Sequence, residues 1–322
     1  MADGNAIPQG AGFTMGDASG PPIFRTLDVA ELLRTTFQPR EMVLGPWLPG
    51  KGLAMIYGLR GAGKTHLSLG IAYAVATGGA FLRWQAPRPR RVLIIDGEMP
   101  AVVLQERMAN IVAMANLEPP SPDGLRFLPM DLHDGGGLDL SNDRCHARLE
   151  AVIDGADLLI VDNISTLASG GGRENEAESW TPIQQWALHQ RRSGRSVLFI
   201  HHAGKGGQQR GTSRREEVLD TVIALRRPTD YQPDQGARFE LHYEKARGLH
   251  GDDANPFEAS LGDGGIWTTR DLADVDMARV LTLSAEGESV RDIATALGMS
   301  KSRVQRLLDK GRALSAMPTS HD

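Results

Sequence analysis

The sequence predicts an α/β fold in which helices flank a central, mostly parallel, twisted sheet, with a small all-α module after it. Between about residues 40 and 270, short apolar runs alternate with longer amphipathic segments. The runs are continuously apolar, which is typical of strands buried on both faces of a parallel sheet. After Trp267 the composition changes, and short helical patterns follow one another through tight turns.

Each strand of the sheet is expected at an apolar run. These runs cover residues 53–57, 91–95, 125–128, 158–161, 197–200 and 221–225. The expected helices are the amphipathic segments 65–76, 101–116, 143–153 and 177–190. Residues 238–243 alternate in hydrophobicity, so we expect an antiparallel strand near an edge of the sheet.

The two ends of the chain are expected to lie outside the sheet. Residues 1–22 are rich in Gly, Ala and Pro and predict a disordered tail. A short helix is expected at 28–35, before a turn leads into the main domain. We therefore expect one large domain over 23–270 and a helical module over 274–315.

Composition and charge narrow the functional class. The chain has 41% hydrophobic residues, a net charge of -5 and a single cysteine. A lone cysteine forms no internal disulfide, no apolar run is long enough to cross a bilayer, and the N-terminus shows no secretory pattern. We expect a cytoplasmic protein with no membrane partner, and not one that coats nucleic acid by bulk attraction.

The most specific motif lies between an expected strand and an expected helix and matches G-x-x-x-x-G-K-T. Glycines let backbone N–H groups curl round phosphates, the lysine reaches the terminal phosphates, and the threonine hydroxyl joins the Mg²⁺ shell. We predict an ATP and Mg²⁺ site here, with a chance glycine loop as the alternative. Its binding residues are Gly58, Arg60, Gly61, Ala62, Gly63, Lys64, Thr65 and His66.

Acidic residues follow two of the expected strands. Asp162 ends the run 158–161 and is expected to hold Mg²⁺ together with Thr65. Asp96 and Glu98 follow the run 91–95, where a carboxylate would face the terminal phosphate and activate the attacking water. Both are candidates for that base, and an exposed loop acid is the alternative interpretation.

A pair of histidines, His201 and His202, follows the run 197–200. A polar side chain beside the γ-phosphate can bond phosphate in one state and a neighbouring loop in another, so it can act as a sensor. Adjacent strand residues point to opposite faces, which disfavours a shared metal ion.

Lys245 and Arg247 are two residues apart and project from the same side of an extended segment. Such a pair is able to bring two cations to a phosphate in a neighbouring subunit, as an arginine finger does. An ion pair with Glu240 or Glu244 is the alternative interpretation.

Together these motifs resemble the RecA-like P-loop ATPases that include the hexameric replicative helicases of plasmids (RepA type) and, more distantly, the bacterial DnaB helicases. The resemblance covers roughly residues 44–267 and also rests on the segments 201–205, 210–213 and 245–248. It implies a homo-oligomeric, hexameric ring that hydrolyses ATP and acts on single-stranded DNA.

The resemblance also implies roles for individual residues. It assigns the catalytic base to Glu98 and the phosphate sensor to one of the paired histidines, of which we favour His202. Lys245 and Arg247 act across the subunit interface, and Lys64 completes the catalytic set. The basic segment 205–215, part of a stretch from 187 to 215 that holds seven Lys or Arg residues and no acid, corresponds to a region that touches single-stranded DNA, with a solvated loop as the alternative. Its candidate DNA contacts are Lys205, Arg210, Arg214 and Arg215.

Residues 289–308 resemble a helix-turn-helix. Apolar residues share one face of each expected helix, Gly298 permits the turn, and Ser300 is a natural N-cap. The exposed face of the second helix suits a groove of duplex DNA. Its candidate contacts are Lys301, Arg303 and Arg306. A small oligomerisation or protein-docking module is the alternative.

Two functions are therefore expected to compete. The favoured one is a ring-shaped motor that hydrolyses ATP on single-stranded DNA, as a replicative helicase of a plasmid, phage or mobile element does. The other is a regulatory or recombination-associated protein in which ATP controls assembly and the C-terminal module reads duplex DNA or a partner. The C-terminal module is extra relative to the minimal plasmid helicase, so the resemblance favours the first without deciding it.

Overall fold

The computed structural model describes residues 26–133, 137–168, 177–204 and 217–315. The chain divides into two compact units, one ending at Pro39 and one beginning at Arg40. In the first unit, α1 (Val29–Arg34) is capped by Asp28, whose carboxylate accepts a hydrogen bond from the Glu31 amide. This confirms the helix expected at 28–35. Within the described residues, no helix has the length and apolar character needed to span a bilayer.

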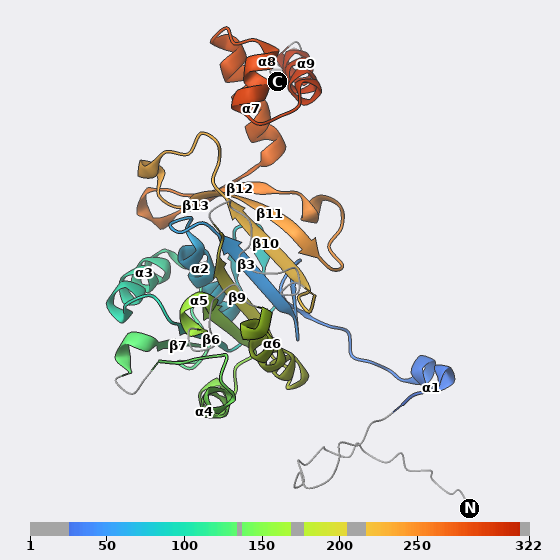
Figure 1. Ribbon diagram of the computed structural model, residues 1–322, viewed down its shortest axis with the longest axis vertical. Coiled ribbons are helices and arrows are strands. Elements are labelled where there is room, and N and C mark those ends of the chain that lie inside the picture. The colour runs from blue at the N-terminus through green and yellow to red at the C-terminus, as the bar shows by residue number, and fades with distance from the viewer. Residues whose placement is uncertain (1–25, 134–136, 169–176, 205–216, 316–322) are drawn as a thin grey trace, which may run out of the picture. The chain divides into compact units, whose positions relative to one another are not determined.

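The second unit is built on one nine-stranded sheet with the order β13-β12-β11-β10-β3-β9-β8-β6-β7 (Figure 1). Six neighbouring strands pair in parallel: β3 (Leu53–Gly58), β6 (Val92–Asp96), β7 (Leu125–Pro129), β8 (Leu158–Asp162), β9 (Ser196–His202) and β10 (Thr221–Arg226). Three antiparallel strands follow beyond β10: β11 (Arg238–Ala246), β12 (Phe257–Leu261) and β13 (Trp267–Asp271). The predicted parallel sheet is thus confirmed.

Helices cover both faces of the sheet. One face packs against α2 (Lys64–Thr77) and α3 (Ala101–Met114), and the other against α4 (Asp143–Ile153), α5 (Ile164–Leu167) and α6 (Ala177–Arg192). Alternate residues of β3 divide between the two cores, since Ala54 and Ile56 join the first and Met55 joins the second. This explains why the run reads as continuously apolar.

Shorter elements complete the unit. The strand pairs β1 (Met42–Leu44) with β2 (Leu48–Pro49), and β4 (Ala80–Phe81) with β5 (Trp84–Gln85), are antiparallel. Single 3-10 turns occur at η1 (Met130–Leu132), η4 (Pro233–Gln235), η5 (Gly251–Ala254) and η6 (Asp263–Gly265).

The antiparallel side of the sheet is larger than the sequence predicts. The expected strand at 238–243 is present as β11, but β12 and β13 lie beyond it, so β13 is the edge strand. The pattern of β13 mixes exposed and half-buried residues, and short strands of mixed polarity carry a weak sequence signal. β13 runs to Asp271 and is followed directly by the first helix of the C-terminal module.

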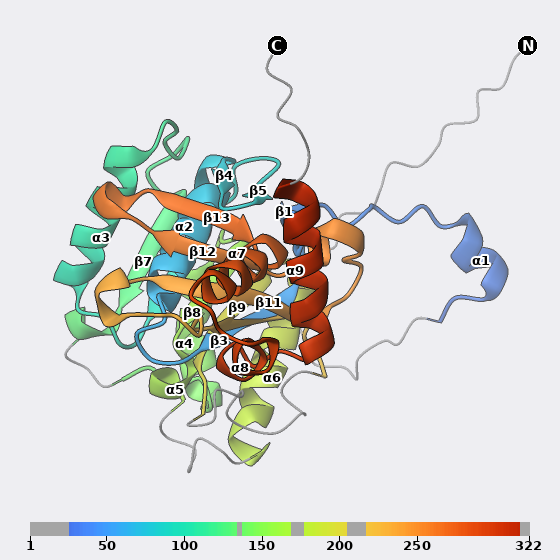
Figure 2. The same ribbon diagram turned by 90° about the horizontal axis from the view of Figure 1, so that it is seen from above.

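The C-terminal module consists of α7 (Leu272–Ala285), α8 (Val290–Ala296) and α9 (Lys301–Ser315), which pack together in Figure 2. It has its own small core, to which Val280, Ile293, Val304 and Leu308 contribute. Gly298 adopts a φ of 61°, so the turn between α8 and α9 uses the left-handed conformation that glycine tolerates. α7 also contacts β12 and β13.

Candidate active site

The glycine-rich loop joins the end of β3 to the start of α2, as the motif predicts. Gly61 and Gly63 have φ values of 72° and 94°, which a residue with a Cβ adopts only with strain. A Cβ on Gly63 would lie 2.9 Å from the Cβ of Ala237, so the loop packs closely against the segment before β11. The loop therefore needs glycine for both conformation and space.

Lys64 is buried at the first turn of α2. Its Nζ donates hydrogen bonds to the carbonyl oxygens of Gly58 at 3.0 Å and Leu59 at 2.9 Å. Burial lowers the pKa of Lys64 to about 8, although the carboxylates of Asp162 and Glu98 oppose this. An ammonium group that is bound only by neutral carbonyls in a buried loop is ready to pair with an anion.

Asp96 and Asp162 lie side by side at the carboxyl ends of β6 and β8, where they are register partners. The Asp162 carboxylate accepts a hydrogen bond from Ser68 Oγ at 3.2 Å, and burial together with the charge of Asp96 raises its pKa to about 7. Asp96 instead accepts from the backbone amides of Glu98 at 2.9 Å and Met99 at 2.7 Å. Asp96 is thus bound by its own loop.

Glu98 takes part in a hydrogen-bonded set with Asn163 and His202. His202 Nε2 lies 3.1 Å from both Glu98 Oε2 and the Asn163 amide nitrogen. Asn163 also donates to Glu98 Oε2. Burial, with the nearby charge of Lys64, lowers the pKa of His202, so the neutral imidazole is favoured. The ends of three parallel strands thereby bring these side chains together.

Sequence reasoning identified two of these three residues and missed Asn163. The sequence feature that could have identified Asn163 is its position directly after β8, at the carboxyl ends of the strands, where the acidic residues were expected. Of the two histidines, His202 lines the cleft described next, whereas His201 is fully buried in β9 and is not among the residues that line it.

These groups surround a cleft of about 660 Å³. Its floor and one wall carry predicted residues: Arg60, Gly61, Gly63, Lys64, Thr65, His66, Glu98, Asp162 and His202. The two other predicted loop residues, Gly58 and Ala62, are buried beneath it. The opposite wall includes Tyr231 and Ala237 from the segment between β10 and β11, which sequence reasoning missed.

Arg107 on α3 also lines the cleft and was not predicted. Burial lowers its pKa, with the carboxylates of Asp162 and Asp96 opposing the effect. Burial and the charge of Arg107 together lower the pKa of His66 to about 4. Among the described residues, none hydrogen-bonds the side chain of Arg60 or of Arg107.

The cleft fits a triphosphate with a divalent cation. Arg60 lines the cleft as an exposed cation. Lys64, which is buried, and Arg107, which is half-buried, lack carboxylate hydrogen bonds among the described residues, and the buried Nδ1 of His202 has no partner there. Such groups are costly to bury unless a ligand satisfies them. Thr65 and Asp162 offer the oxygen ligands that Mg²⁺ prefers.

Comparison with protein families agrees with this geometry. Residues 20–208, more than half of the chain, match the model of the AAA domain family. The chain belongs to the AAA domain family. It therefore has a RecA-like, P-loop ATPase-type domain, and the fold class predicted from the sequence is confirmed.

Other comparisons of this AAA domain protein add less. A crystal structure of a KaiC-like protein from the hyperthermophilic archaeon Pyrococcus horikoshii OT3 is similar over 69% of this chain and 90% of that chain. The identity is 16% and the TM-score is 0.49. No curated protein matches the sequence significantly.

Residues 278–311 match a homeodomain-like domain, which agrees with the expected helix-turn-helix. Ser300 caps α9, since its hydroxyl accepts from the Arg303 amide at 3.3 Å. Lys301 and Arg306 are exposed on α9, as expected. Arg303 is half-exposed, but its guanidinium donates to Asp276 on α7 at 2.5 Å, an intramolecular contact that the sequence did not predict.

The remaining predicted residues lie away from this cleft or outside the described chain. Lys245 and Arg247 both donate to the carbonyl oxygen of Glu217, at 3.5 Å and 3.3 Å, so they project together. β11 runs antiparallel to β10, and its last residues lie beside the first residues of β10 and β3, at the end of the sheet opposite the loop. Lys205, Arg210, Arg214 and Arg215 fall outside the described residues.

Proposed function

We propose that this AAA domain protein hydrolyses ATP with Mg²⁺ in the cleft between the glycine-rich loop and the ends of β6, β8 and β9. The observation that carries this proposal is the set of Glu98, Asn163 and His202 beside the loop lysine and Asp162. A carboxylate, an amide and a neutral imidazole in contact are suited to hold a water molecule and register a phosphate.

The proposed roles follow from what each side chain is able to do. Lys64 exchanges its carbonyl partners for the terminal phosphates, and Arg60 and Arg107 add charge at the mouth of the cleft. Thr65 and Asp162 hold the Mg²⁺, which when bound neutralises charge on the phosphates. Glu98 accepts the proton of the attacking water, since Asp96 is bound by backbone amides.

His202 is proposed as the sensor of the terminal phosphate. Its Nε2 bonds Glu98 and Asn163, while its buried Nδ1 has no partner among the described residues. A ring shift that trades one set of bonds for another would report the phosphate state to β9 and the segment after it.

We further propose that the protein acts as a ring, hexameric as in the plasmid helicases that its motifs resemble, and moves on single-stranded DNA. Lys245 and Arg247 project together from one end of the sheet, and the glycine-rich loop of the same chain lies at the opposite end. A pair in that place serves a phosphate only in a neighbouring subunit. The basic segment 205–215 is the proposed contact with single strands.

The deciding experiment measures ATP turnover without DNA, with single strands and with duplex. Stimulation by single strands, with binding that weakens steeply as salt rises, is the expected result. Turnover that no DNA changes would remove the motor while leaving the ATPase. Absence of ATP binding in the presence of Mg²⁺ would remove both.

A second candidate function is favoured by the position of the C-terminal module. Arg279 of α7 donates to Glu240 and Glu258 of the sheet, so the module is bound to the ATPase domain by ion pairs. That arrangement suits a regulator in which ATP controls how the helix-turn-helix reads duplex DNA. It predicts tight duplex binding that is lost when residues beyond about 274 are removed. Duplex affinity that survives this truncation would count against it.

A further inference from the structure

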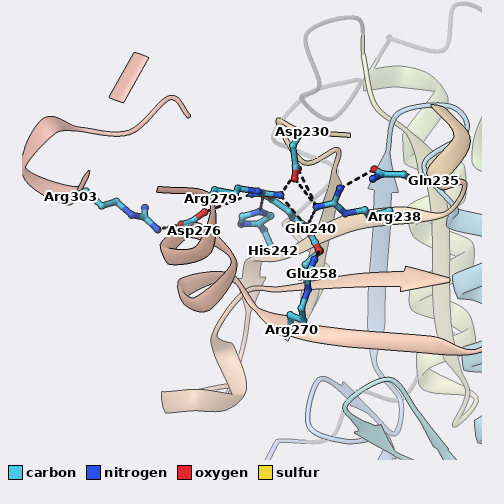
Figure 3. Close-up of polar contacts among 10 residues, drawn as sticks. All are labelled: Asp230, Gln235, Arg238, Glu240, His242, Glu258, Arg270, Asp276, Arg279 and Arg303. Atoms are coloured by element: carbon cyan, nitrogen blue, oxygen red, sulfur yellow. Dashed lines mark hydrogen bonds and ion pairs between the residues drawn. The ribbon is translucent and has the colours of Figure 1, made fainter. Parts of the chain in front are cut away.

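A cluster of ion pairs lies where the C-terminal module meets the sheet, and Figure 3 shows its side chains converging from β11, β12, β13, α7 and the segment after β10. We call it the ion-pair cluster and define it by its residues: Asp230, Arg238, Glu240, Glu258, Arg270 and Arg279. Arg238 and Arg279 have side-chain exposures of only 8% and 11%, and Glu258 of 1%. Charges buried to this degree hold a structure in place only while all of them are paired.

Arg279 links α7 to the ATPase domain through ion pairs. Its guanidinium donates to Asp230 at 2.7 Å, to Glu240 at 3.1 Å and to Glu258 at 3.1 Å. α7 follows β13 without a linker, so a displacement of Arg279 would move α7 and the helices packed on it. Removing a single partner would leave a buried guanidinium incompletely compensated.

Asp230 connects the cluster to the nucleotide cleft. It bonds Arg238 at 3.1 Å and Arg279 at 2.7 Å, and the next residue, Tyr231, begins the segment that forms the far wall of the cleft. Arg227, four residues before Tyr231, lies over the Tyr231 ring and donates to the Arg60 carbonyl of the glycine-rich loop. A ligand in the cleft therefore touches a segment that is bound to α7 through one carboxylate.

Arg303 connects the cluster to the proposed DNA-reading helix. It donates to Asp276 at 2.5 Å, and Asp276 lies one turn before Arg279 on α7, at 3.8 Å from it. A guanidinium held by a carboxylate is not free for a phosphate or a base edge. In this arrangement the module presents α9 with one of its predicted DNA contacts occupied.

We propose that the ion-pair cluster is a latch that holds the helix-turn-helix in a state of low duplex affinity, and that nucleotide in the cleft releases it through Asp230. The proposal rests on the assignment of ATP to the cleft. A nucleotide releases the latch by binding more tightly to the arrangement in which the 231–237 segment has moved and the Arg279–Asp230 pair is broken. By linkage, duplex DNA then tightens nucleotide binding by the same factor.

The test compares the full-length protein with its Asp230→Asn variant. Asp230 is exposed, so the variant is expected to fold, and the substitution removes the carboxylate while keeping the side-chain shape. Asp274→Asn is the matched control, because Asp274 is exposed on α7 and, within the described residues, has no hydrogen bond or ion pair. Both variants lose one negative charge, so a general gain in attraction to DNA affects both.

Fluorescence anisotropy with a labelled duplex of mixed sequence measures affinity with and without a non-hydrolysable ATP analogue and Mg²⁺. We expect the analogue to raise the duplex affinity of the unmodified protein and of Asp274→Asn by at least about fivefold. Asp230→Asn is expected to bind tightly in both conditions. Equal behaviour of Asp230→Asn and Asp274→Asn overturns the latch, as does an analogue that binds but changes no affinity.

Hydrogen exchange of the α7 amides gives a readout that requires no DNA. We expect faster exchange in Asp230→Asn than in Asp274→Asn without any nucleotide, and faster exchange in the unmodified protein when the analogue is bound. Failure of the proposed ATP site shows as no analogue binding in any variant. Failure of the latch shows as unchanged exchange in Asp230→Asn, whether or not the analogue binds.

Discussion

At the scale of single residues, the cleft separates carboxylates that look alike in the sequence. Asp96 is bound by the amides of its own loop, whereas Glu98 has a half-exposed side chain that meets His202 and Asn163. Asp162 is buried at the end of β8, where it accepts a hydrogen bond from Ser68. The same chemical group therefore occupies three environments, and of the three only Glu98 combines a half-exposed side chain with a place in the lining of the cleft.

Replacing Glu98 with Gln is expected to preserve ATP binding and to lower the turnover number by about 100-fold or more, because the amide cannot accept the proton of water. Steady-state turnover and equilibrium binding of ATP measure the two effects separately. Glu106→Gln on α3 is the control, since Glu106 is exposed and has no hydrogen bond or ion pair within the described residues. Normal turnover in Glu98→Gln would assign the base elsewhere.

Replacing Gly63 with Ala is expected to weaken ATP binding by at least about tenfold, because the loop has to move to accommodate a Cβ at positive φ. Gly194→Ala is a matched control: Gly194 has a φ of 95°, and a Cβ there would have no neighbour within 4 Å. Both variants should lower the melting temperature, but only Gly63→Ala should lose ATP. An equal loss of ATP binding in both would point to global destabilisation.

At the scale of elements, the antiparallel strands β11 and β12 connect the ATPase domain with α7. Burial opposes ionisation of Glu240, but hydrogen bonds from His242 and Arg279 outweigh it and hold its pKa below the usual value. The pKa of Asp230 is also held below its usual value, because bonds to Arg238 and Arg279 outweigh the effect of burial. Asp276, which also faces Arg279, has its pKa raised by burial, so its titration acts in the opposite direction.

These directions predict how pH affects the junction. Because the pKa of each carboxyl group is lowered in the folded protein, its ionised form stabilises the fold. This contribution is fully present at a pH above the ordinary pKa, which is 4.5 for Glu240 and 3.8 for Asp230. It is lost as the pH falls through the lower pKa of the folded state. The melting temperature of Arg279→Gln should therefore lie below that of the unmodified protein near neutrality, and the gap should close in acid. A gap that stays constant from neutral pH to below pH ~4 would contradict the prediction.

At the scale of the whole molecule, the sheet places two sets of charged groups at opposite ends. The cleft lies at the carboxyl ends of the parallel strands, and Lys245 and Arg247 lie at the other end. In a closed ring such an arrangement allows one subunit to complete the site of the next. In the ring that we propose, each site would be complete only between copies.

This arrangement predicts that Arg247→Ala acts only within an assembly. Mixing the variant with unmodified subunits should lower ATP turnover more steeply than the variant fraction, because each variant subunit also leaves a neighbouring site incomplete. Turnover is measured across a series of mixing ratios at constant total protein. Rates that add independently would eliminate the contact between subunits.

Local patterns in the sequence determined where most strands and helices follow one another along the chain, together with the glycine-rich loop and the helices at the C-terminus. Such features depend on neighbours close in the chain: apolar periodicity, glycine at positive φ and a serine cap. The loop residues Gly61, Gly63 and Lys64 could be predicted because their spacing alone defines the shape that phosphate requires. β12 and β13 were missed because short strands of mixed polarity depend on their partners.

Only the tertiary structure brought together Glu98, Asn163 and His202, which lie at the ends of three strands, and placed Arg107 in the lining of the same cleft. It also paired Arg279 with Asp230, 49 positions away, and occupied Arg303 with Asp276. No local pattern specifies such pairs, because an arginine gains from any carboxylate that the fold brings within reach, and the order of strands decides which one that is.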